Sequence, residues 1–94
     1  MKLRLFPAAI RDLKELRAYI AADDPAASVS VSARLGKAIA LIAEKPSIGR
    51  PTPQRPIREW AVPGLPYLIP YRIEGDTVEI LRVWHTSRER PLEW

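Results

Sequence analysis

The sequence predicts an α+β domain in which a pair of helices covers one face of a mainly antiparallel sheet. Two observations support this class: apolar residues recur at helical spacing in the first half of the chain, and β-type runs dominate the second half. The chain has 94 residues, of which 47% are apolar and 28% are charged. That length and balance predict a single globular domain spanning residues 1–94, with a thin core.

The N-terminal segment predicts a strand followed by a helix. Residues 2–6 alternate between charged and apolar side chains, which is typical of a short, half-buried strand. Pro7 follows, and proline is tolerated in the first turn of a helix. The residues after it place one apolar stripe on a helix of about four turns: Ala9, Leu13, Leu16 and Ile20.

A second helix is predicted to follow after a short turn. Asp24 is a suitable N-cap and Pro25 a suitable first helical residue. The helix is expected to reach about Glu44, since Pro46 cannot continue it. Its apolar stripe consists of Val31, Leu35, Ala38 and Ile42, flanked by Ile39. The two helices form an αα-hairpin that needs a sheet to bury its stripes.

The C-terminal half predicts three further strands. Six prolines make residues 46–66 mostly an extended connection, although residues 57–62 are free of proline and can form a strand. Residues 67–73 and 77–85 read as a hairpin around a short glycine-containing loop, and the second of these strands is expected to be central. Pro70 marks an edge, a bulge or an unpaired position. The first strand must cross over the helical hairpin to reach this sheet, and the uncovered face is free to carry function.

Composition excludes several classes of protein. The absence of cysteine rules out disulfides and thiolate metal sites, and a single histidine, His85, rules out a multi-histidine site, so neither a metal nor a cofactor is expected. No apolar run is expected to reach the roughly 18 residues needed to cross a membrane, and charges interrupt any signal-peptide core, so we expect a cytoplasmic protein without membrane contact. The net charge of +4 permits nucleic-acid contact without requiring it.

Candidate functional side chains lie in the second half. From Pro46 onward every basic residue is arginine, a type that binds carboxylates, phosphates and aromatic faces in fixed geometry: Arg50, Arg55, Arg58, Arg72, Arg82, Arg88 and Arg90. A coding bias toward arginine is an equally good explanation. Arg50 could instead pair with an acidic residue or with carbonyls at the helix end, and a lone histidine such as His85 is more often structural. Nothing in the sequence places Ser87 against His85, and no glycine-rich phosphate loop occurs.

These residues resemble a known family. The run YLIPYRI at 67–73, Gly75-Asp76 and the run VEILRVWH at 78–85 are similar to the ParE branch of the ParE/RelE toxin superfamily. The helical hairpin and the Pro46-x-x-Gly49-Arg50 pattern after it support the resemblance, which covers the whole chain in order and length. Pro70 departs from the β-branched residue that is usual at its position.

The resemblance implies a toxin of a type II toxin–antitoxin module of the plasmid-stabilisation type. ParE-type members poison DNA gyrase and are not enzymes, whereas RelE-type members cleave mRNA on the ribosome with clustered basic residues and a tyrosine or histidine. Here Leu68, Ile69 and Pro70 stand where a ribonuclease would carry a basic residue, and no lysine follows Arg50. We therefore expect gyrase inhibition, with endoribonuclease activity or a differently targeted toxin as alternatives; a plain RNA-binding module fits the charge poorly.

The resemblance also implies functional roles for individual residues. For gyrase binding they are Arg50, Arg58, Arg82, His85, Arg88, Arg90 and Trp94, and a ribonuclease would instead use Arg50, Arg72, Arg82, His85 and Arg88. A ParD-like antitoxin with a ribbon-helix-helix end is the implied partner in a hetero-oligomer, and it provides the only contact with DNA. Its contacts are expected at exposed positions of the helices, namely Tyr19, Ala22, Leu35 and Ile39, and at the sheet edge. A charged tail such as Thr86 to Trp94 is usually frayed. The functional alternative is that it docks, on its own sheet or in the target, and the resemblance favours the target.

Overall fold

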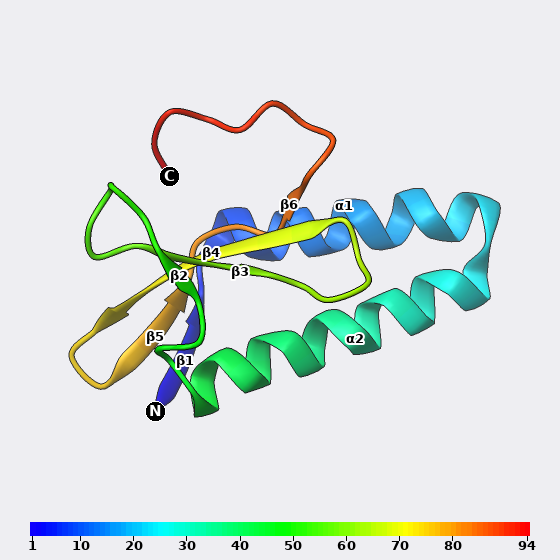
Figure 1. The fold of residues 1–94 in the computed structure, drawn as a ribbon. Coiled ribbons are helices and arrows are strands. Elements are labelled where there is room, and N and C mark those ends of the chain that lie inside the picture. Colours follow the sequence, from blue (N-terminus) through cyan, green and yellow to red (C-terminus); the bar gives the residue numbers. More distant parts are fainter.

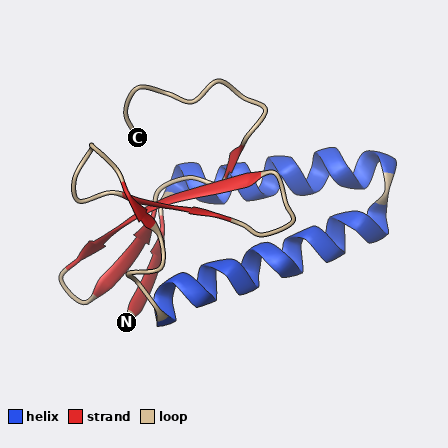
Figure 2. Ribbon diagram, viewed as in Figure 1, coloured by secondary structure: helices blue, strands red, loops and turns tan.

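Two helices lie side by side on one face of a six-stranded sheet, in a computed structural model that describes residues 1–94 (Figures 1 and 2). The elements in chain order are β1 (Lys2–Leu5), α1 (Pro7–Asp23), α2 (Pro25–Glu44), β2 (Arg50–Pro51), β3 (Arg58–Ala61), β4 (Tyr67–Glu74), β5 (Thr77–Ile80) and β6 (Trp84–His85). The predicted α+β class is confirmed. Both predicted helices are present, and the Asp24 side chain caps α2 by accepting from the Ala27 N–H at 3.0 Å.

The sheet is mixed, with strand order β1-β5-β4-β3-β2 and β6 paired to β4. β1 joins β5 in parallel, from Lys2 opposite Thr77 to Leu5 opposite Ile80, and all other pairs are antiparallel. The first strand therefore crosses over the helical hairpin, as predicted. β5 lies between β1 and β4, which confirms the prediction that this part of the chain is central. The short strand β2 was not predicted, since its two residues carry no alternation.

The strand predicted over residues 77–85 is wrong in its middle, because the chain leaves the ladder between β5 and β6. There the Asp12 carboxylate of α1 accepts from the Val83 N–H at 3.0 Å, so that donor is no longer available to β4. Pro70 of β4 faces the same gap: its carbonyl accepts from the Leu81 N–H at 2.9 Å, and its ladder partner on the other side is Glu59. A proline without an N–H is tolerated here, since no ladder bond is lost.

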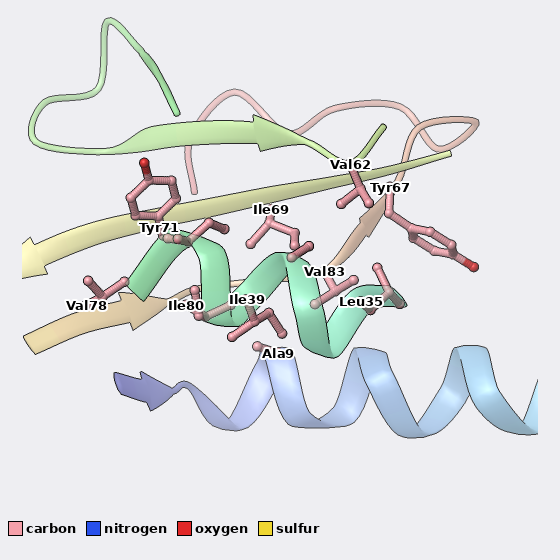
Figure 3. Close-up of a cluster of buried hydrophobic side chains, with 12 residues drawn as sticks. Ala9, Leu35, Ile39, Val62, Tyr67, Ile69, Tyr71, Val78, Ile80 and Val83 are labelled. Carbon is pink, nitrogen blue, oxygen red and sulfur yellow. The ribbon is translucent and has the colours of Figure 1, made fainter. Parts of the chain in front are cut away.

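The core lies between the helices and the inner face of the sheet (Figure 3). Twelve buried residues form it: Ala9, Leu35, Ala38, Ile39, Ile42, Val62, Tyr67, Ile69, Tyr71, Val78, Ile80 and Val83. This corrects one expectation. Leu35 and Ile39, which were expected to be exposed for antitoxin contact, are 0% and 6% exposed, because the stripe of α2 turns them toward the sheet. Of the four proposed contacts, only Tyr19 and Ala22 are exposed.

The helix α2 meets the length and composition criteria for crossing a membrane, which corrects the expectation that no segment would. The helix has 20 residues, and a window of 18 of them contains no more than two charged side chains. The core helix of a soluble protein can meet the same criteria, so this feature is weak evidence that α2 crosses a membrane. In the fold, α2 contributes Leu35, Ala38, Ile39 and Ile42 to the core.

Tyr71 of β4 connects the sheet to the segment after α2 by two hydrogen bonds. Its hydroxyl accepts from the Gly49 N–H at 2.8 Å and donates to the Pro46 carbonyl at 2.6 Å. Burial raises the pKa of Tyr71, although the Gly49 hydrogen bond and the charge of Arg58 oppose the shift. A Cβ at Gly49 would lie 2.6 Å from the Tyr71 ring, so the close approach requires glycine. This contact fixes where the segment after α2 begins.

We expect Tyr71→Phe to lower the free energy of unfolding by about 1–3 kcal/mol, because a buried N–H and a carbonyl lose their partner. Tyr67→Phe is the matched control, since the Tyr67 ring is also buried in the core but its hydroxyl makes no hydrogen bond within the chain. Urea unfolding of both variants measures the difference. Equal losses in the two variants would contradict the anchoring role of Tyr71.

Candidate functional site

The face of the sheet turned away from the helices carries acidic side chains that hold arginines. The first is Glu79 of β5, which is buried. Its carboxylate accepts from Arg72 Nε at 2.8 Å and from Arg4 Nη1 at 3.2 Å. The Arg4 and Arg72 guanidinium carbons also lie 5.2 and 5.4 Å from the centre of the Phe6 ring. The two arginines of this row therefore share a single carboxylate, which compensates only part of their charge.

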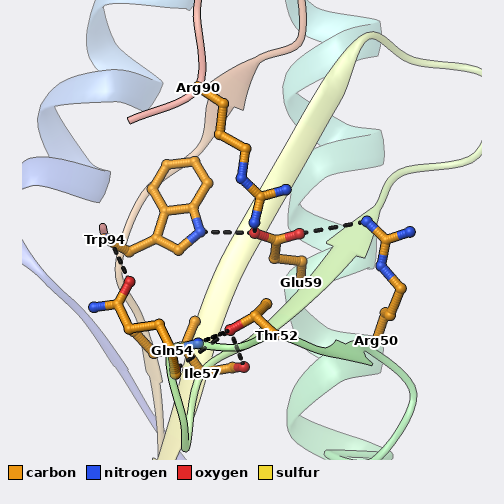
Figure 4. A network of polar contacts seen from close by, with 7 residues as sticks. All are labelled: Arg50, Thr52, Gln54, Ile57, Glu59, Arg90 and Trp94. Atoms are coloured by element: carbon orange, nitrogen blue, oxygen red, sulfur yellow. Dashed lines mark hydrogen bonds and ion pairs between the residues drawn. The ribbon is translucent and has the colours of Figure 1, made fainter. Parts of the chain in front are cut away.

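A second carboxylate, Glu59 of β3, is the centre of a larger network (Figure 4). Its side chain is only 1% exposed, yet it contacts two arginines. Arg50 Nη2 lies 3.6 Å from Oε1, and both Arg90 and the Trp94 indole N–H bond to Oε2, the indole at 2.7 Å. A buried carboxylate is stable only when it is paired and hydrogen bonded. Here Oε2 accepts two hydrogen bonds, whereas Oε1 has no hydrogen bond and faces only the charge of Arg50.

The third carboxylate, Asp12, reaches the sheet from α1 and holds Arg82. Its two oxygens accept from Arg82 Nε at 2.7 Å and Nη2 at 2.9 Å. This bidentate geometry is the strongest form of the arginine–carboxylate pair. The hydrogen bonds to Asp12 raise the pKa of Arg82 above its ordinary value, so the guanidinium stays charged. It also lies 5.0 Å from the Trp84 ring centre.

The C-terminal tail, residues 86–94, folds back onto the sheet rather than fraying (Figure 1). The Trp94 backbone N–H donates to Gln54 Oε1 at 2.7 Å, in the loop between β2 and β3. The Trp94 and Trp84 rings meet edge to face with centres 5.5 Å apart, and the Arg88 guanidinium lies 4.1 Å from the Trp84 ring centre. Of the two docking alternatives, the structure shows the tail on its own sheet; contact with a target stays a prediction.

His85 lies at the edge of a cavity of about 310 Å³ between α1 and β6. Its Nδ1 accepts from the Ser87 N–H at 3.0 Å and lies 2.7 Å from Ser87 Oγ. The Tyr67 ring packs edge-on at 5.2 Å, and burial raises the pKa of Tyr67. Asp12 and Glu15 line the cavity but neither bonds to His85, so no Ser-His-Asp arrangement is formed. No group of three His, Asp or Glu side chains could hold a metal ion.

Arg58 has a different environment from the other predicted arginines. Its Nη1 donates to the Gly49 carbonyl at 2.8 Å and to the Ser47 carbonyl at 3.4 Å. These carbonyls follow α2, so Arg58 stabilises the same connection that Tyr71 holds. Bonding to these carbonyls was one of the two structural roles considered for Arg50; the structure shows the other, pairing with an acidic residue, Glu59.

The structure thus links five predicted target-binding residues through Trp84 and Glu59: Arg50, Arg82, Arg88, Arg90 and Trp94. His85 instead faces the cavity beside α1. Sequence reasoning missed the carboxylates that hold the arginines. For Glu79 a signal existed, since it lies between Val78 and Ile80 in its strand, whereas Glu59 lies between Arg58 and Trp60 and carried a weaker signal. Asp12 carried no such signal, because an acidic residue on a helix is ordinarily solvated.

We expect Arg50→Ala to change the melting temperature only slightly. The Arg50 side chain is 76% exposed, and ion pairs at exposed positions contribute about 0–1 kcal/mol. Toxicity is therefore expected to fall without unfolding if Arg50 contacts the target. Calorimetry beside a growth assay measures both quantities. A melting temperature lower by many degrees would instead assign Arg50 a structural role through Glu59.

Comparison with known proteins finds one matching family model and two similar relatives. A family model described as "ParE toxin of type II toxin-antitoxin system, parDE" matches residues 3–90. The chain is 47% identical over 83 residues to "Putative toxin Y4kP" of Sinorhizobium fredii, covering 88% of this chain and 85% of that protein. It is 33% identical over 85 residues to "Toxin RelE1" of Caulobacter vibrioides, covering 85% and 87%.

A solved structure has the same fold. A chain of the "Chromosomal ParDE TA system from P. aeruginosa" superposes with a TM-score of 0.81, covering 90% of this chain and 95% of that one. The sequence identity in this pair is 19%, so the likeness concerns the fold alone.

Proposed function

The chain belongs to the family of ParE toxins of type II toxin–antitoxin systems, and from this premise we propose that it arrests growth by binding DNA gyrase. In this proposal it acts as a binding protein in the cytoplasm, where gyrase and its DNA are found, and it catalyses no reaction. A ParD-like antitoxin with a ribbon-helix-helix DNA-binding end neutralises it in a hetero-oligomer.

One observation carries the choice of binding over catalysis: most arginines of the sheet already face a carboxylate of the chain. Arg72 bonds to Glu79 and Arg82 to Asp12, and Arg50 forms a longer ion pair with Glu59. A ribonuclease must place uncompensated donors where negative charge develops in the transition state. Guanidinium groups that each face a nearby carboxylate supply little of that field. They still offer donors and planar surfaces to a protein target.

The outer face also has the composition of a protein-binding surface. Arginine and tryptophan are enriched at binding hot spots, and here Arg88 stacks on Trp84 while Arg90 lies 5.5 Å from the Trp94 ring centre. Leu92 of the tail is fully exposed. Since docking holds the tail in one conformation, less conformational entropy is lost when a target binds. We propose that gyrase contacts this surface.

For the antitoxin we propose contacts on the far end of the helical hairpin. Tyr19 is 84% exposed, Val29 is also exposed, and Ala22 lies on α1 near them in sequence. An amphipathic helix from a partner can cover such residues. The likeness to a chain from a ParDE system supports a protein partner of this kind.

Endoribonuclease activity is the second candidate, and two observations favour it. One relative at 33% identity is named as a RelE toxin. In addition, the cavity beside His85 is also lined by Tyr67 and Arg88, and these residue types can transfer protons and bind phosphate. In this account Arg88, which forms no ion pair, would contact the phosphate.

Induction of the chain in cells without its antitoxin tests the choice. Plasmid supercoiling and the integrity of a translated mRNA are followed in the same cultures. We expect plasmids to relax or break while the mRNA stays intact. The double variant His85→Gln, Arg88→Gln serves as a ribonuclease-deficient control: mRNA cleavage that disappears in this variant, with supercoiling untouched, would replace gyrase inhibition by the second candidate.

A further inference from the structure

A basic cavity of about 420 Å³ opens between β4 and the loop that joins β2 to β3. Ligand sites in proteins have volumes of roughly 300–1,000 Å³, so this cavity can hold a small organic molecule. Its wall contains neither an acidic residue nor a histidine, and three of its nine residues are arginines: Arg55, Arg58 and Arg72. A cleft lined by charge of one sign attracts a ligand of the opposite sign, which here is an anion.

The loop that forms one wall of the cavity is held by hydrogen bonds of its own. The hydroxyl and the backbone N–H of Thr52 both donate to the Ile57 carbonyl, at 2.8 and 3.1 Å. The Ile57 N–H in turn donates to the Gln54 carbonyl at 2.9 Å. A site that is ordered before its ligand arrives loses less conformational entropy on binding. The wall is therefore preformed.

Guanidinium donors are free in this cavity. The Arg55 side chain forms no hydrogen bond and no ion pair within the chain. Arg72 uses only Nε, for Glu79, and Arg58 uses only Nη1, for two carbonyls. An anion can therefore bind without displacing an existing partner. A phosphate monoester suits these donors better than a carboxylate, because it carries about two charges and three terminal oxygens.

Apolar side chains complete the wall. Ile57 and Ile73 line the cavity together with Pro51 and Pro56, and Ile73 is 38% exposed. Burial of apolar surface under a ligand is favourable, and these side chains offer a surface on which a flat ring can pack. The cavity thus favours a ligand that joins an anionic group to a flat, weakly polar body.

No side chain in the cavity is free to carry out chemistry. The Tyr71 hydroxyl is held by two backbone groups of the segment after α2, and the Thr52 hydroxyl is held by the Ile57 carbonyl. A nucleophile or general base must reach the reacting atom of its substrate, and both hydroxyls are already engaged. The cavity is therefore suited to binding, unlike the cavity beside His85.

We propose that this cavity binds a free mononucleotide, with the phosphate against Arg55 and Arg72 and the base against Ile57 and Ile73. A mononucleotide joins a phosphate monoester to a flat aromatic base, which are the two features that the wall favours. Within a nucleic-acid strand each phosphate is a diester with a single charge, so a strand makes poorer use of the free guanidinium groups. The inference does not rest on gyrase as the target, since Arg55 has no part in either proposed function.

Titration of the full-length protein with AMP, followed by backbone amide NMR, tests this inference. We expect saturable shifts at the amides of residues 55, 57, 72 and 73, with an affinity that falls as salt is added. Arg55→Ala should weaken binding about tenfold, because a charge-assisted contact is lost. Arg11→Ala is the matched control: it removes an exposed arginine from α1 and should change the affinity by less than about twofold.

Three further probes separate the features of the ligand. Adenosine lacks the phosphate, glucose 6-phosphate carries a polar ring in place of the base, and inorganic phosphate has no organic body. Each should bind at least about tenfold more weakly than AMP.

The proposal is overturned if AMP causes no shifts at these residues at millimolar concentration, if Arg55→Ala binds AMP as well as the unaltered chain does, or if any of the three probes matches AMP. Single-stranded DNA without terminal phosphates that shifts the same residues and binds more tightly than AMP would also overturn it, since the cavity would then belong to a site for a strand.

Discussion

Replacement of Asp12 by alanine is expected to lower the free energy of unfolding by about 2–4 kcal/mol. The buried carboxylate accepts three hydrogen bonds, two from Arg82 and one from the Val83 N–H. Alanine would leave a partly buried guanidinium and a buried amide without partners. Because domains of this size have stabilities of about 5–15 kcal/mol, with about 4–8 °C in melting temperature per kcal/mol, the loss is a large fraction of the total.

The control for this variant is Glu15→Ala, which removes the same charge from an exposed position almost one turn further along α1. It should alter stability by no more than about 0.5 kcal/mol. Asp12→Asn tests the geometry further, since an amide keeps one acceptor oxygen but loses the charge, and an intermediate effect is expected. Urea unfolding is the measurement. If Asp12→Ala is as stable as Glu15→Ala, the break between β5 and β6 does not depend on this carboxylate.

Removal of residues 86–94 is expected to abolish growth inhibition while leaving the affinity for the antitoxin within about tenfold, or ~1.4 kcal/mol. The tail supplies Arg88, Arg90 and Trp94 to the outer face. The exposed residues proposed for the antitoxin, Tyr19 and Ala22, lie on α1 and outside the tail. A growth assay beside calorimetric titration of the antitoxin separates the two activities.

Truncation also removes two of the donors that hold the buried Glu59 carboxylate, so circular dichroism must first show that the shortened chain is folded. Glu59→Gln in the full-length chain is the companion variant. It keeps every residue of the tail but weakens its docking, and we expect growth inhibition to persist at reduced potency. A folded, truncated protein that still arrests growth would show that the tail is dispensable.

The sequence predicted the helices well because their signals are local. Asp24, Pro25 and Pro46 mark helix ends by fixed backbone chemistry, and the α2 stripe at Leu35, Ala38 and Ile42 is buried as its spacing requires. The break after β5 could not be predicted, since it depends on Asp12, about 70 residues away in the chain. The exposure of Leu35 and Ile39 was misjudged. Leu35 belongs to the buried stripe itself, and α2 packs against both α1 and the sheet, which widens its buried face to include Ile39.

The candidate site was predictable only in part. Residue type identified the arginines and Trp94, and the order of the strands placed them near one face. Their partners were not predictable, because each pair joins elements distant in the sequence, such as Arg90 with Glu59 of β3. Charge compensation is therefore a property of the fold, and it changes the chemistry that the arginines can perform.

The central claim, that this chain acts by binding gyrase and not by cleaving RNA, is tested most directly with purified components. Purified DNA gyrase and relaxed plasmid are incubated with increasing amounts of the toxin, and translating ribosomes with a defined mRNA receive the same amounts. The account predicts that supercoiling is lost as toxin is added, that added antitoxin restores it, and that the mRNA remains full-length. Cleaved mRNA together with undiminished supercoiling would contradict it.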